Sequence, residues 1–187
     1  MIFALFSYFY VDKNLALYFH ENIVGTHLYI WEYITEIGDA KYSIALGVVL
    51  LLFFKLNKKI FYFGAILSSS VALSGLSTDL IKFVVGRSRP NMLINENIYT
   101  FKPLQQYSYD FISMPSGHTT TVFSMAAVFS IFYPRFSYLF FFIAVVGGMS
   151  RVVLQKHFLS DVVIGAIVGT VVTVYLHKKF FEKRLEI

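Results

Sequence analysis

Residues 158–176 read FLSDVVIGAIVGTVVTVYL, an apolar run with a single charged side chain, Asp161, near its start. A bilayer core requires about 20 mainly apolar residues in helical form, so this run predicts a transmembrane helix. The whole chain has the same character: 57% of its 187 residues are hydrophobic and 14% are charged, with a mean hydropathy of +0.64. A soluble domain typically carries about 25% charged residues. The composition therefore argues against a water-soluble globular domain.

Five apolar stretches predict an all-α, polytopic membrane bundle of about five transmembrane helices. The stretches are Ala40–Leu56, Ile60–Val85, Thr119–Tyr133, Phe136–Met149 and Phe158–Leu176. The third and fourth are short, so we expect them to extend into polar residues at one end. The Gly165/Gly169 spacing in the fifth is typical of helices that approach each other closely. We expect a single domain over residues 1–187, with the bundle in residues 40–180.

The N-terminal residues 1–38 differ because polar side chains interrupt them. The interrupting residues are Asp12, Lys13, His20 and Glu21, and the apolar residues at helical spacing further on are Leu28, Trp31, Ile34 and Ile37. This pattern predicts amphipathic helices in the membrane interface, where Trp also concentrates. The alternative is a short, polar first span over residues 1–19, which would make six transmembrane helices. No secretory signal is expected, because the start lacks a basic region and a small-residue cleavage site.

The Lys and Arg residues predict how the bundle is oriented. Basic residues follow the first, third and fifth stretches: Lys55, Lys58, Lys59, Arg135, Lys178, Lys179, Lys183 and Arg184. Five alternating spans would place all of them on one side, which the positive-inside rule assigns to the cytoplasm. We therefore expect the remaining polar segments to face the outer side, which is the periplasm if the chain is a bacterial inner-membrane protein. The net charge of +5 then reflects these anchors and an anionic ligand, with no nucleic-acid partner.

Three polar segments fall on the outer side, each at the end of a different span: Lys82–Pro90, Pro115–His118 and Ser150–Asp161. Lys82, Arg89 and Arg151 supply three cations, and like charges beside lipid are costly unless an anion compensates them. Because guanidinium groups match phosphate oxygens in bidentate geometry, the segments predict a phosphate site. Three further basic residues, Arg87, Lys102 and Lys156, are expected to be ordinary interfacial side chains.

The segment Pro115-Ser116-Gly117-His118 opens the third span. The first amides of a helix lack partners and can bind an anion, although Ser116 can equally be a plain helix N-cap.

Two histidines suggest catalysis. His157 and Asp161 lie at i and i+4, so on a helix they would share one face and could hydrogen-bond. Such a pair fixes the tautomer of the imidazole and directs its other nitrogen as a nucleophile or base. Zinc binding by His118, His157 and a carboxylate is the competing reading, which the surrounding cations oppose. The chain has no cysteine, which excludes thiolate ligands, disulfides and a Cys nucleophile.

Taken together, Lys82-x6-Arg89-Pro90, Pro115-Ser116-Gly117-His118 and Ser150-Arg151-x5-His157-x3-Asp161 resemble the three-part signature of the type-2 phosphatidic acid phosphatase superfamily. Residues, order and internal spacings match without departure. The resemblance implies an all-helical bundle that hydrolyses phosphate esters without a metal or other cofactor. The apolar spans are similar to the membrane lipid phosphatases of the superfamily rather than to its soluble acid phosphatases and haloperoxidases.

The resemblance also implies a role for each site residue. His157 would attack phosphorus and become a phosphohistidine, Asp161 would orient it, and His118 would protonate the leaving oxygen and then activate water. The phosphoryl oxygens would be held by Lys82, Arg89, Ser116, Gly117 and Arg151.

The substrate follows from the resemblance only in outline. The small size and compact motifs are similar to bacterial lipid A 1-phosphatases, which rank first. Phosphatidylglycerophosphate and undecaprenyl pyrophosphate phosphatases are alternatives, as is phosphoryl transfer to a second lipid on the same scaffold. A non-catalytic anion transporter would leave both histidines unexplained. The expected partners are the substrate lipid and the bilayer, with no obligate protein partner.

Overall fold

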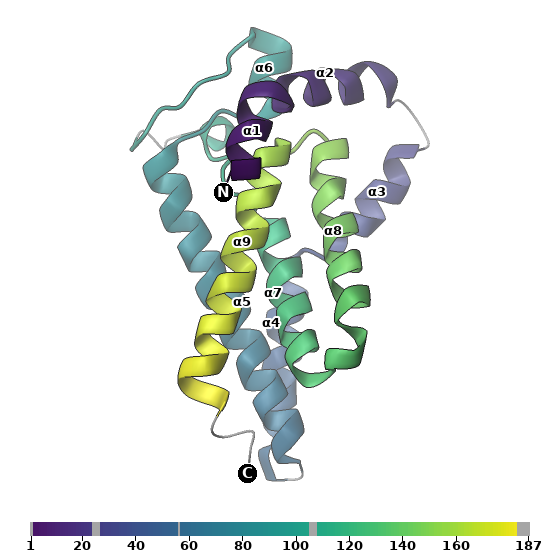
Figure 1. Cartoon of the computed structure of the whole chain (residues 1–187), viewed down its shortest axis with the longest axis vertical. Helices are drawn as coiled ribbons and strands as arrows, with labels where there is room; N and C mark the ends of the chain where they lie inside the picture. Colours follow the sequence, from purple (N-terminus) through teal and green to yellow (C-terminus); the bar gives the residue numbers. More distant parts are fainter. Residues whose placement is uncertain (1, 24–26, 56, 105–107, 183–187) are drawn as a thin grey trace.

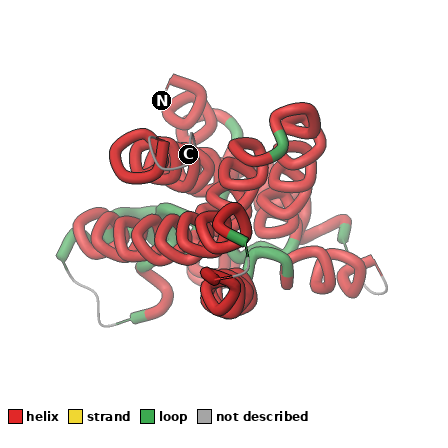
Figure 2. Tube along the Cα trace, turned by 90° about the horizontal axis from the view of Figure 1, so that it is seen from below, coloured by secondary structure: helices red, strands yellow, loops and turns green. Residues whose placement is uncertain are grey.

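The computed structural model describes residues 2–23, 27–55, 57–104 and 108–182; the predicted anchors Lys183 and Arg184 lie outside these ranges. Helices make up all the regular structure in the described ranges, and no strand is present there (Figures 1 and 2). The main bundle consists of α4 (Ala40–Leu51), α5 (Lys58–Val85), α7 (Gly117–Phe132), α8 (Ser137–Val153) and α9 (Leu159–Leu176). The predicted all-α bundle is therefore confirmed.

The helix bounds follow the apolar stretches closely. Within the described ranges, three segments are long and apolar enough to cross a membrane: Lys58–Val85, Pro134–Val153 and Leu159–Phe181. The helix α7 is a shorter apolar helix, and it begins at Gly117, inside the polar motif, as expected for a span that was short by hydropathy alone. By contrast, α4 ends at Leu51 and continues as a 3-10 turn over Leu52–Lys55, so the first stretch is less regular than predicted.

Small and hydroxyl residues join α5, α7 and α9 at the centre of the bundle. Ser74 and Ser124 hydroxyls lie 2.8 Å apart, and Thr78 and Thr120 hydroxyls 3.0 Å apart. A Cβ atom on Gly165 would stand only 2.6 Å from the Ser116 carbonyl oxygen, so the close approach predicted for the Gly165/Gly169 face is confirmed. Lipid removes the hydrophobic drive between helices, so such close packing and hydrogen bonds hold a membrane bundle together.

The outer surface of the bundle is apolar. Leu76 on α5, Phe142 on α8 and Val171 on α9 are each more than half exposed. Large apolar side chains on the outside of three membrane-length helices suit contact with lipid tails.

The N-terminal residues form α1 (Ile2–Tyr10), α2 (Asp12–Asn22) and α3 (His27–Glu36). In Figure 1, α2 lies across the top of the bundle, while α1 packs beside the start of α9 and α3 descends beside α8. The described part of the N-terminal segment is thus mainly helical, as predicted; its place at the membrane interface stays a prediction.

The two ends of the bundle differ. At one end, Figure 1 brings together the last turns of α5 and α8 and the first turns of α7 and α9. At the other end lie the start of α5, the 3-10 turn Pro134–Phe136 between α7 and α8, and the end of α9. The motif segments therefore share one end, and the described basic anchors Lys58, Lys59, Arg135, Lys178 and Lys179 lie toward the other.

Candidate active site

Local sequence explains how the first motif reaches the site. Lys82 lies in the last turn of α5, and Gly86 ends that helix in the left-handed conformation, with φ of 59°. Glycine adopts this conformation without the strain that a side chain would bring, and the chain can therefore turn sharply. Arg89 then caps α6 (Pro90–Glu96), whose first residue is the proline that favours a helix start.

The second motif is tied to the third by its backbone. Ser116 is the N-cap of α7: its hydroxyl accepts from the Thr119 amide at 3.5 Å, as the plain-cap reading anticipated. The Ser116 amide donates to the Asp161 carbonyl oxygen at 3.0 Å, which joins the first turns of α7 and α9. A Cβ atom on Gly117 would stand 3.7 Å from Lys82 Nζ, so the start of α7 faces the end of α5.

Lys82, Arg89 and Arg151 are buried or half-buried, and they are poorly neutralised. Among the described residues, their one carboxylate within salt-bridge distance is the exposed Asp79, 3.8 Å from Lys82 Nζ. Burial also lowers the pKa of Arg89, because the charged form loses hydration there. The three cations would be stabilised by an anion between them.

Arg89 and Arg151 are nevertheless held in place by neutral groups. Arg89 donates to the carbonyl oxygens of Tyr109 and Lys156, both at 2.9 Å, and its guanidinium stacks 3.8 Å from the centre of the Tyr109 ring. Arg151 donates through Nη1 to the Thr35 hydroxyl of α3 at 2.7 Å. Its buried Nε has no acceptor among the described residues. An unsatisfied buried N–H of a cation is a group that a phosphate oxygen would satisfy.

His157 is buried in the turn between α8 and α9, with its Nδ1 atom 2.8 Å from the Ser113 carbonyl oxygen. A carbonyl oxygen only accepts, so Nδ1 carries the hydrogen and Nε2 holds a free lone pair. Burial lowers the pKa of His157 to about 3, since the imidazolium would lose its hydration. The neutral ring with a free Nε2 has the form that a nucleophile requires.

The predicted pairing of His157 with Asp161 is present as an ion-pair contact, but not as a direct hydrogen bond on one helical face. His157 precedes α9, so the two residues do not share a helical face, and their closest atoms, Nδ1 and Oδ2, are 3.8 Å apart. Asp161 Oδ2 instead accepts from the Ser113 hydroxyl at 2.6 Å and from the Phe158 amide at 2.9 Å. Asp161 therefore reaches His157 through Ser113, whose hydroxyl binds the carboxylate and whose carbonyl binds the imidazole.

The interpretation of Arg87 as an interfacial side chain is wrong. Arg87 is 1% exposed, and its guanidinium bridges two buried carboxylates, Asp12 of α2 at 2.7 Å and Asp161 at 2.5 Å. Those carboxylates raise the pKa of Arg87 despite its burial. Lys102 and Lys156, by contrast, are exposed.

His118, on the first turn of α7, is half-buried. The turn before α4 packs against it: a Cβ atom on Gly38 would stand 3.0 Å from the Cβ of His118.

The residues proposed as zinc ligands are not gathered into a metal site. Within the described part of the chain, no group of three or more His, Asp or Glu side chains is placed to hold a metal ion. The oxygens of Asp161 already accept hydrogen bonds from Arg87, Ser113 and Phe158.

Four residues of this network were not predicted as part of it: Asp12, Thr35, Arg87 and Ser113. The sequence held one usable signal, since Asp12 and Arg87 are opposite charges in apolar surroundings, and such charges are usually paired.

The comparisons with known proteins agree with this site. The model of the PAP2 superfamily, the type-2 phosphatidic acid phosphatases, matches residues 63–185, which include all three motif segments. The chain belongs to the PAP2 superfamily.

Individual proteins resemble the chain in sequence or in fold. A lipid A 1-phosphatase of Rhizobium etli is 32% identical over 74% of the chain; the match covers 65% of that relative, so the chain spans less than two thirds of its length. The crystal structure of LpxE from Aquifex aeolicus superposes with a TM-score of 0.62 at 18% identity, covering 90% of this chain and 95% of the other. A transmembrane PAP2-type phosphatidylglycerolphosphate phosphatase from Bacillus subtilis gives a TM-score of 0.63 at 22% identity, over 97% and 94%. The fold is that of transmembrane PAP2 enzymes.

Proposed function

We propose that this chain removes a phosphate group from a membrane lipid through a phosphohistidine intermediate on His157. The observation that carries the proposal is the cluster of Lys82, Arg89 and Arg151, which is short of negative charge next to two histidines. Phosphoryl transfer depends on positioning and on stabilising charge on the phosphoryl oxygens. A site with three poorly neutralised cations, an unsatisfied Arg151 Nε and a neutral histidine is suited to that chemistry.

The proposed reaction has two steps. The lone pair of His157 Nε2 attacks phosphorus, the bond from phosphorus to the lipid oxygen breaks, and His118 donates its proton to that oxygen. His118 then takes a proton from a water molecule, whose oxygen attacks phosphorus and releases phosphate from Nε2. Lys82, Arg89, Arg151, the Ser116 hydroxyl and the Gly117 amide would hold the phosphoryl oxygens throughout, and Asp161 would orient His157 through Ser113. No metal is required by this scheme.

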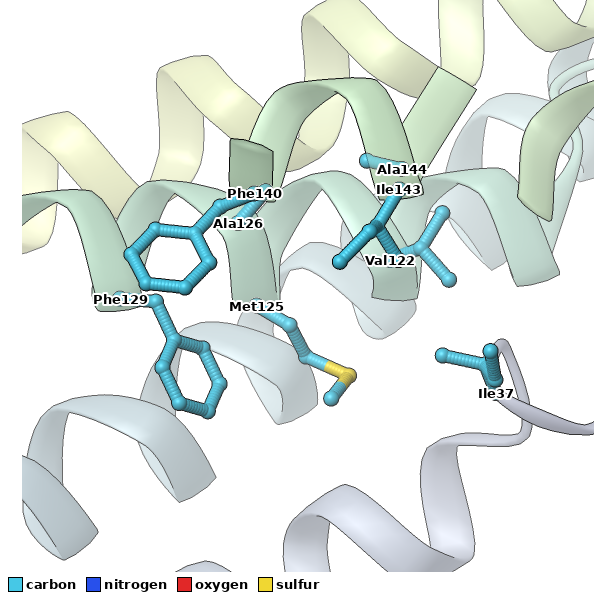
Figure 3. Close-up of a pocket in the computed structure, with 8 residues that line it drawn as sticks. All are labelled: Ile37, Val122, Met125, Ala126, Phe129, Phe140, Ile143 and Ala144. Carbon is cyan, nitrogen blue, oxygen red and sulfur yellow. The ribbon is translucent and has the colours of Figure 1, made fainter. Parts of the chain in front are cut away.

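An apolar groove supports a lipid substrate. Figure 3 shows it between α7 and α8, with Ile37 from the turn after α3 on its other side. The groove has a volume of about 230 Å³, and its lining residues are Ile37, Val122, Met125, Ala126, Phe129, Phe140, Ile143 and Ala144. Val122, Ala126 and Phe129 continue the face of α7 that carries His118, so the groove starts one turn from the predicted general acid. It could receive an acyl chain while the headgroup meets the cations.

Lipid A carrying a 1-phosphate is the first candidate substrate. The similar protein from Rhizobium etli is named a lipid A 1-phosphatase, and the identity of 32% spans most of this chain. The site should open to the periplasm at the inner membrane, because the described basic anchors lie toward the opposite end of the bundle.

The test is release of inorganic phosphate by the purified protein in detergent, with EDTA present. Lipid A 1-phosphate, phosphatidylglycerophosphate and undecaprenyl pyrophosphate are compared as substrates, without an acceptor lipid. We expect release from lipid A in EDTA, and none from His157→Gln. Loss of activity in EDTA that a divalent metal restores would overturn the metal-free mechanism. Release only in the presence of an acceptor would identify a phosphotransferase instead, and a different preferred lipid would replace lipid A in the proposal.

A further inference from the structure

Asp12, the first residue of α2, is a buried carboxylate that the proposed reaction does not use. It is 1% exposed and lies outside residues 63–185, the part matched by the family model. Burying a carboxylate is expensive unless charged and hydrogen-bonding partners compensate it. Its partners therefore show what the N-terminal helices contribute to the molecule.

The two oxygens of Asp12 bind three different parts of the chain. Oδ1 accepts from the Ser7 hydroxyl of α1 at 2.9 Å and from the Ser160 amide at the start of α9 at 3.0 Å. Oδ2 accepts from Arg87 Nη2 at 2.7 Å and from the Ser160 hydroxyl at 2.5 Å. Asp12 thus supplies an acceptor to one of the free amides in the first turn of α9, the helix that carries Asp161.

Arg87 lies between Asp12 and Asp161 in an enclosed setting. Its Nη1 donates to Asp161 Oδ1 and to the Ser160 hydroxyl, while its Nη2 is occupied by Asp12 and by the Tyr99 hydroxyl at 2.8 Å. The guanidinium carbon also lies 4.4 Å from the centre of the Phe158 ring.

This arrangement controls which oxygen of Asp161 remains available. Because Asp12 holds Nη2, Arg87 binds only Oδ1 of Asp161, and Oδ2 is left to the Ser113 hydroxyl and the Phe158 amide. Ser113 in turn accepts from His157 Nδ1 through its carbonyl oxygen. A guanidinium freed from Asp12 could bind both oxygens of Asp161 and compete with Ser113.

We propose that Asp12 is a positioning residue of the active site: it orients Arg87 against Asp161, and so fixes Ser113 and the His157 ring. The proposal rests on the proposed phosphatase function. It makes the N-terminal helices a part of the catalytic unit rather than only a cover over the bundle.

The test compares Asp12→Asn with Glu21→Gln, which removes the same charge from an exposed position on α2. The measurements are kcat/KM for the lipid substrate, and inhibition constants for orthovanadate and for inorganic phosphate. Vanadate accepts a fifth ligand as the transferred phosphoryl group does, so its affinity reports the placement of His157 Nε2. Inorganic phosphate binds through the cation cluster, which Asp12 does not touch.

We expect Asp12→Asn to lower kcat/KM about 10- to 100-fold, the usual cost of losing a group that orients a functional residue. The inhibition constant for vanadate should rise by a similar factor, whereas that for phosphate should stay within about twofold of wild type. Glu21→Gln should leave kcat/KM and both inhibition constants unchanged. Equal losses of vanadate and phosphate affinity, or a kcat/KM equal to wild type, would overturn the proposal. A wild-type protein without phosphatase activity would instead refute the proposed function.

Ser160→Ala provides a second variant that removes no charge, should Asp12→Asn fail to fold. It deletes the hydroxyl that bridges Asp12 and Arg87. The same selective rise of the vanadate constant, smaller in size, is expected. An unchanged vanadate constant and kcat/KM in this folded variant would overturn the proposal.

Discussion

Arg87 and Arg151 are both buried arginines at the same end of the bundle, but their surroundings are opposite. Both have a buried Nε without an acceptor among the described residues, but Arg87 has two carboxylates within hydrogen-bond distance, whereas the side-chain partner of Arg151 is the neutral Thr35 hydroxyl. A buried cation with its counter-charges contributes to folding, and its removal leaves those charges unpaired. A buried cation without them adds little to stability and is available to a ligand.

Arg151→Ala should therefore impair catalysis without unfolding the protein. We expect kcat/KM to fall about 100- to 1,000-fold, as when one donor to a developing oxyanion is removed. The melting temperature should stay within a few degrees of wild type or rise, because no carboxylate loses its partner. Enzyme kinetics and thermal unfolding in detergent measure both effects, with the exposed Lys156→Ala as the control. Near-normal turnover of Arg151→Ala would contradict the proposed phosphate site.

Arg87→Met, unlike Arg151→Ala, should lower the stability of the folded protein. Its loss leaves Asp12 and Asp161 buried without their shared cation, which we expect to cost about 3–5 kcal/mol of unfolding free energy. Denaturant or thermal unfolding in detergent, compared with the exposed Arg135→Met, measures this. A stability equal to wild type would mean that the two carboxylates are protonated or solvated in the membrane.

His157 makes a testable contribution to the pH dependence of stability. Its pKa is lowered to about 3 by burial, while the unfolded chain has the ordinary histidine value of about 6.5. Below about pH 6.5 the unfolded state takes up a proton that the folded state refuses, so stability is lost as the pH falls toward 3. Each pH unit in this window costs on the order of 1.4 kcal/mol.

His157→Gln should remove that slope. Unfolding measured between pH 7 and about pH 4.5 should show a flatter decline for this variant than for wild type. His20→Gln, at an exposed position of α2, should retain the wild-type slope. Parallel curves for wild type and His157→Gln would show that His157 is not buried as a neutral ring.

Some of the site residues could be predicted from the sequence, and others could not. The cations and both histidines were found because they stand in short motifs with fixed spacing. Arg87 was misassigned because its partners Asp12 and Asp161 lie 75 and 74 residues away along the chain. The direct His157–Asp161 hydrogen bond is not formed because α9 begins at Leu159: His157 lies in the turn before the helix, and its contact with Asp161 is 3.8 Å long.

At the scale of the helices, hydropathy predicted α5, α8 and α9 well, because lipid requires each span to be apolar and internally hydrogen-bonded. It predicted α4 less well, since this helix has 12 residues before the 3-10 turn. The placement of α1–α3 could not be read in the same way. These helices are located by contacts between residues far apart in sequence, such as the hydrogen bond of Thr35 with Arg151, 116 residues apart. The role of the N-terminal segment therefore emerged only from the structure.

The groove between α7 and α8 leads to a prediction about lipid selectivity. Ala126→Phe should fill much of its volume of about 230 Å³ and so obstruct an acyl chain. We expect KM for the long-chain lipid to rise about tenfold, because losing apolar contact between an acyl chain and the groove costs on the order of 1–3 kcal/mol of binding free energy. Hydrolysis of water-soluble para-nitrophenyl phosphate should be unchanged, because the phosphate site is intact.

Leu76→Phe, on the outer surface of α5, is the matched control for the groove variant, because it adds bulk where the chain already faces outward. It should leave both substrates unaffected. If Ala126→Phe impaired para-nitrophenyl phosphate and lipid equally, the substitution would be acting on the catalytic groups, and the groove would not be the acyl site.

At the scale of the whole molecule, the two ends of the bundle carry different kinds of charge. The motif end holds Lys82, Arg89 and Arg151 buried or half-buried around a site, with the exposed Lys102 and Lys156 in loops beside it. The other end carries runs of exposed basic residues, such as Lys58 and Lys59 at a helix start. Exposed basic residues at span ends are the ones that set orientation in the membrane. The phosphatase chemistry should therefore take place on the periplasmic side of the inner membrane.

Cysteine labelling tests this orientation directly, because the natural chain contains no cysteine to react in the background. Glu96→Cys lies at the exposed end of α6, beside the site, and Lys58→Cys lies at the exposed start of α5, at the other end of the bundle. On intact spheroplasts, a membrane-impermeant maleimide should label Glu96→Cys and should leave Lys58→Cys unlabelled until the membrane is broken. Both variants should retain phosphatase activity, since neither position contributes a group to the site. Labelling in the reverse order would place the site in the cytoplasm, where the enzyme would meet newly made lipid instead of lipid already in the outer leaflet.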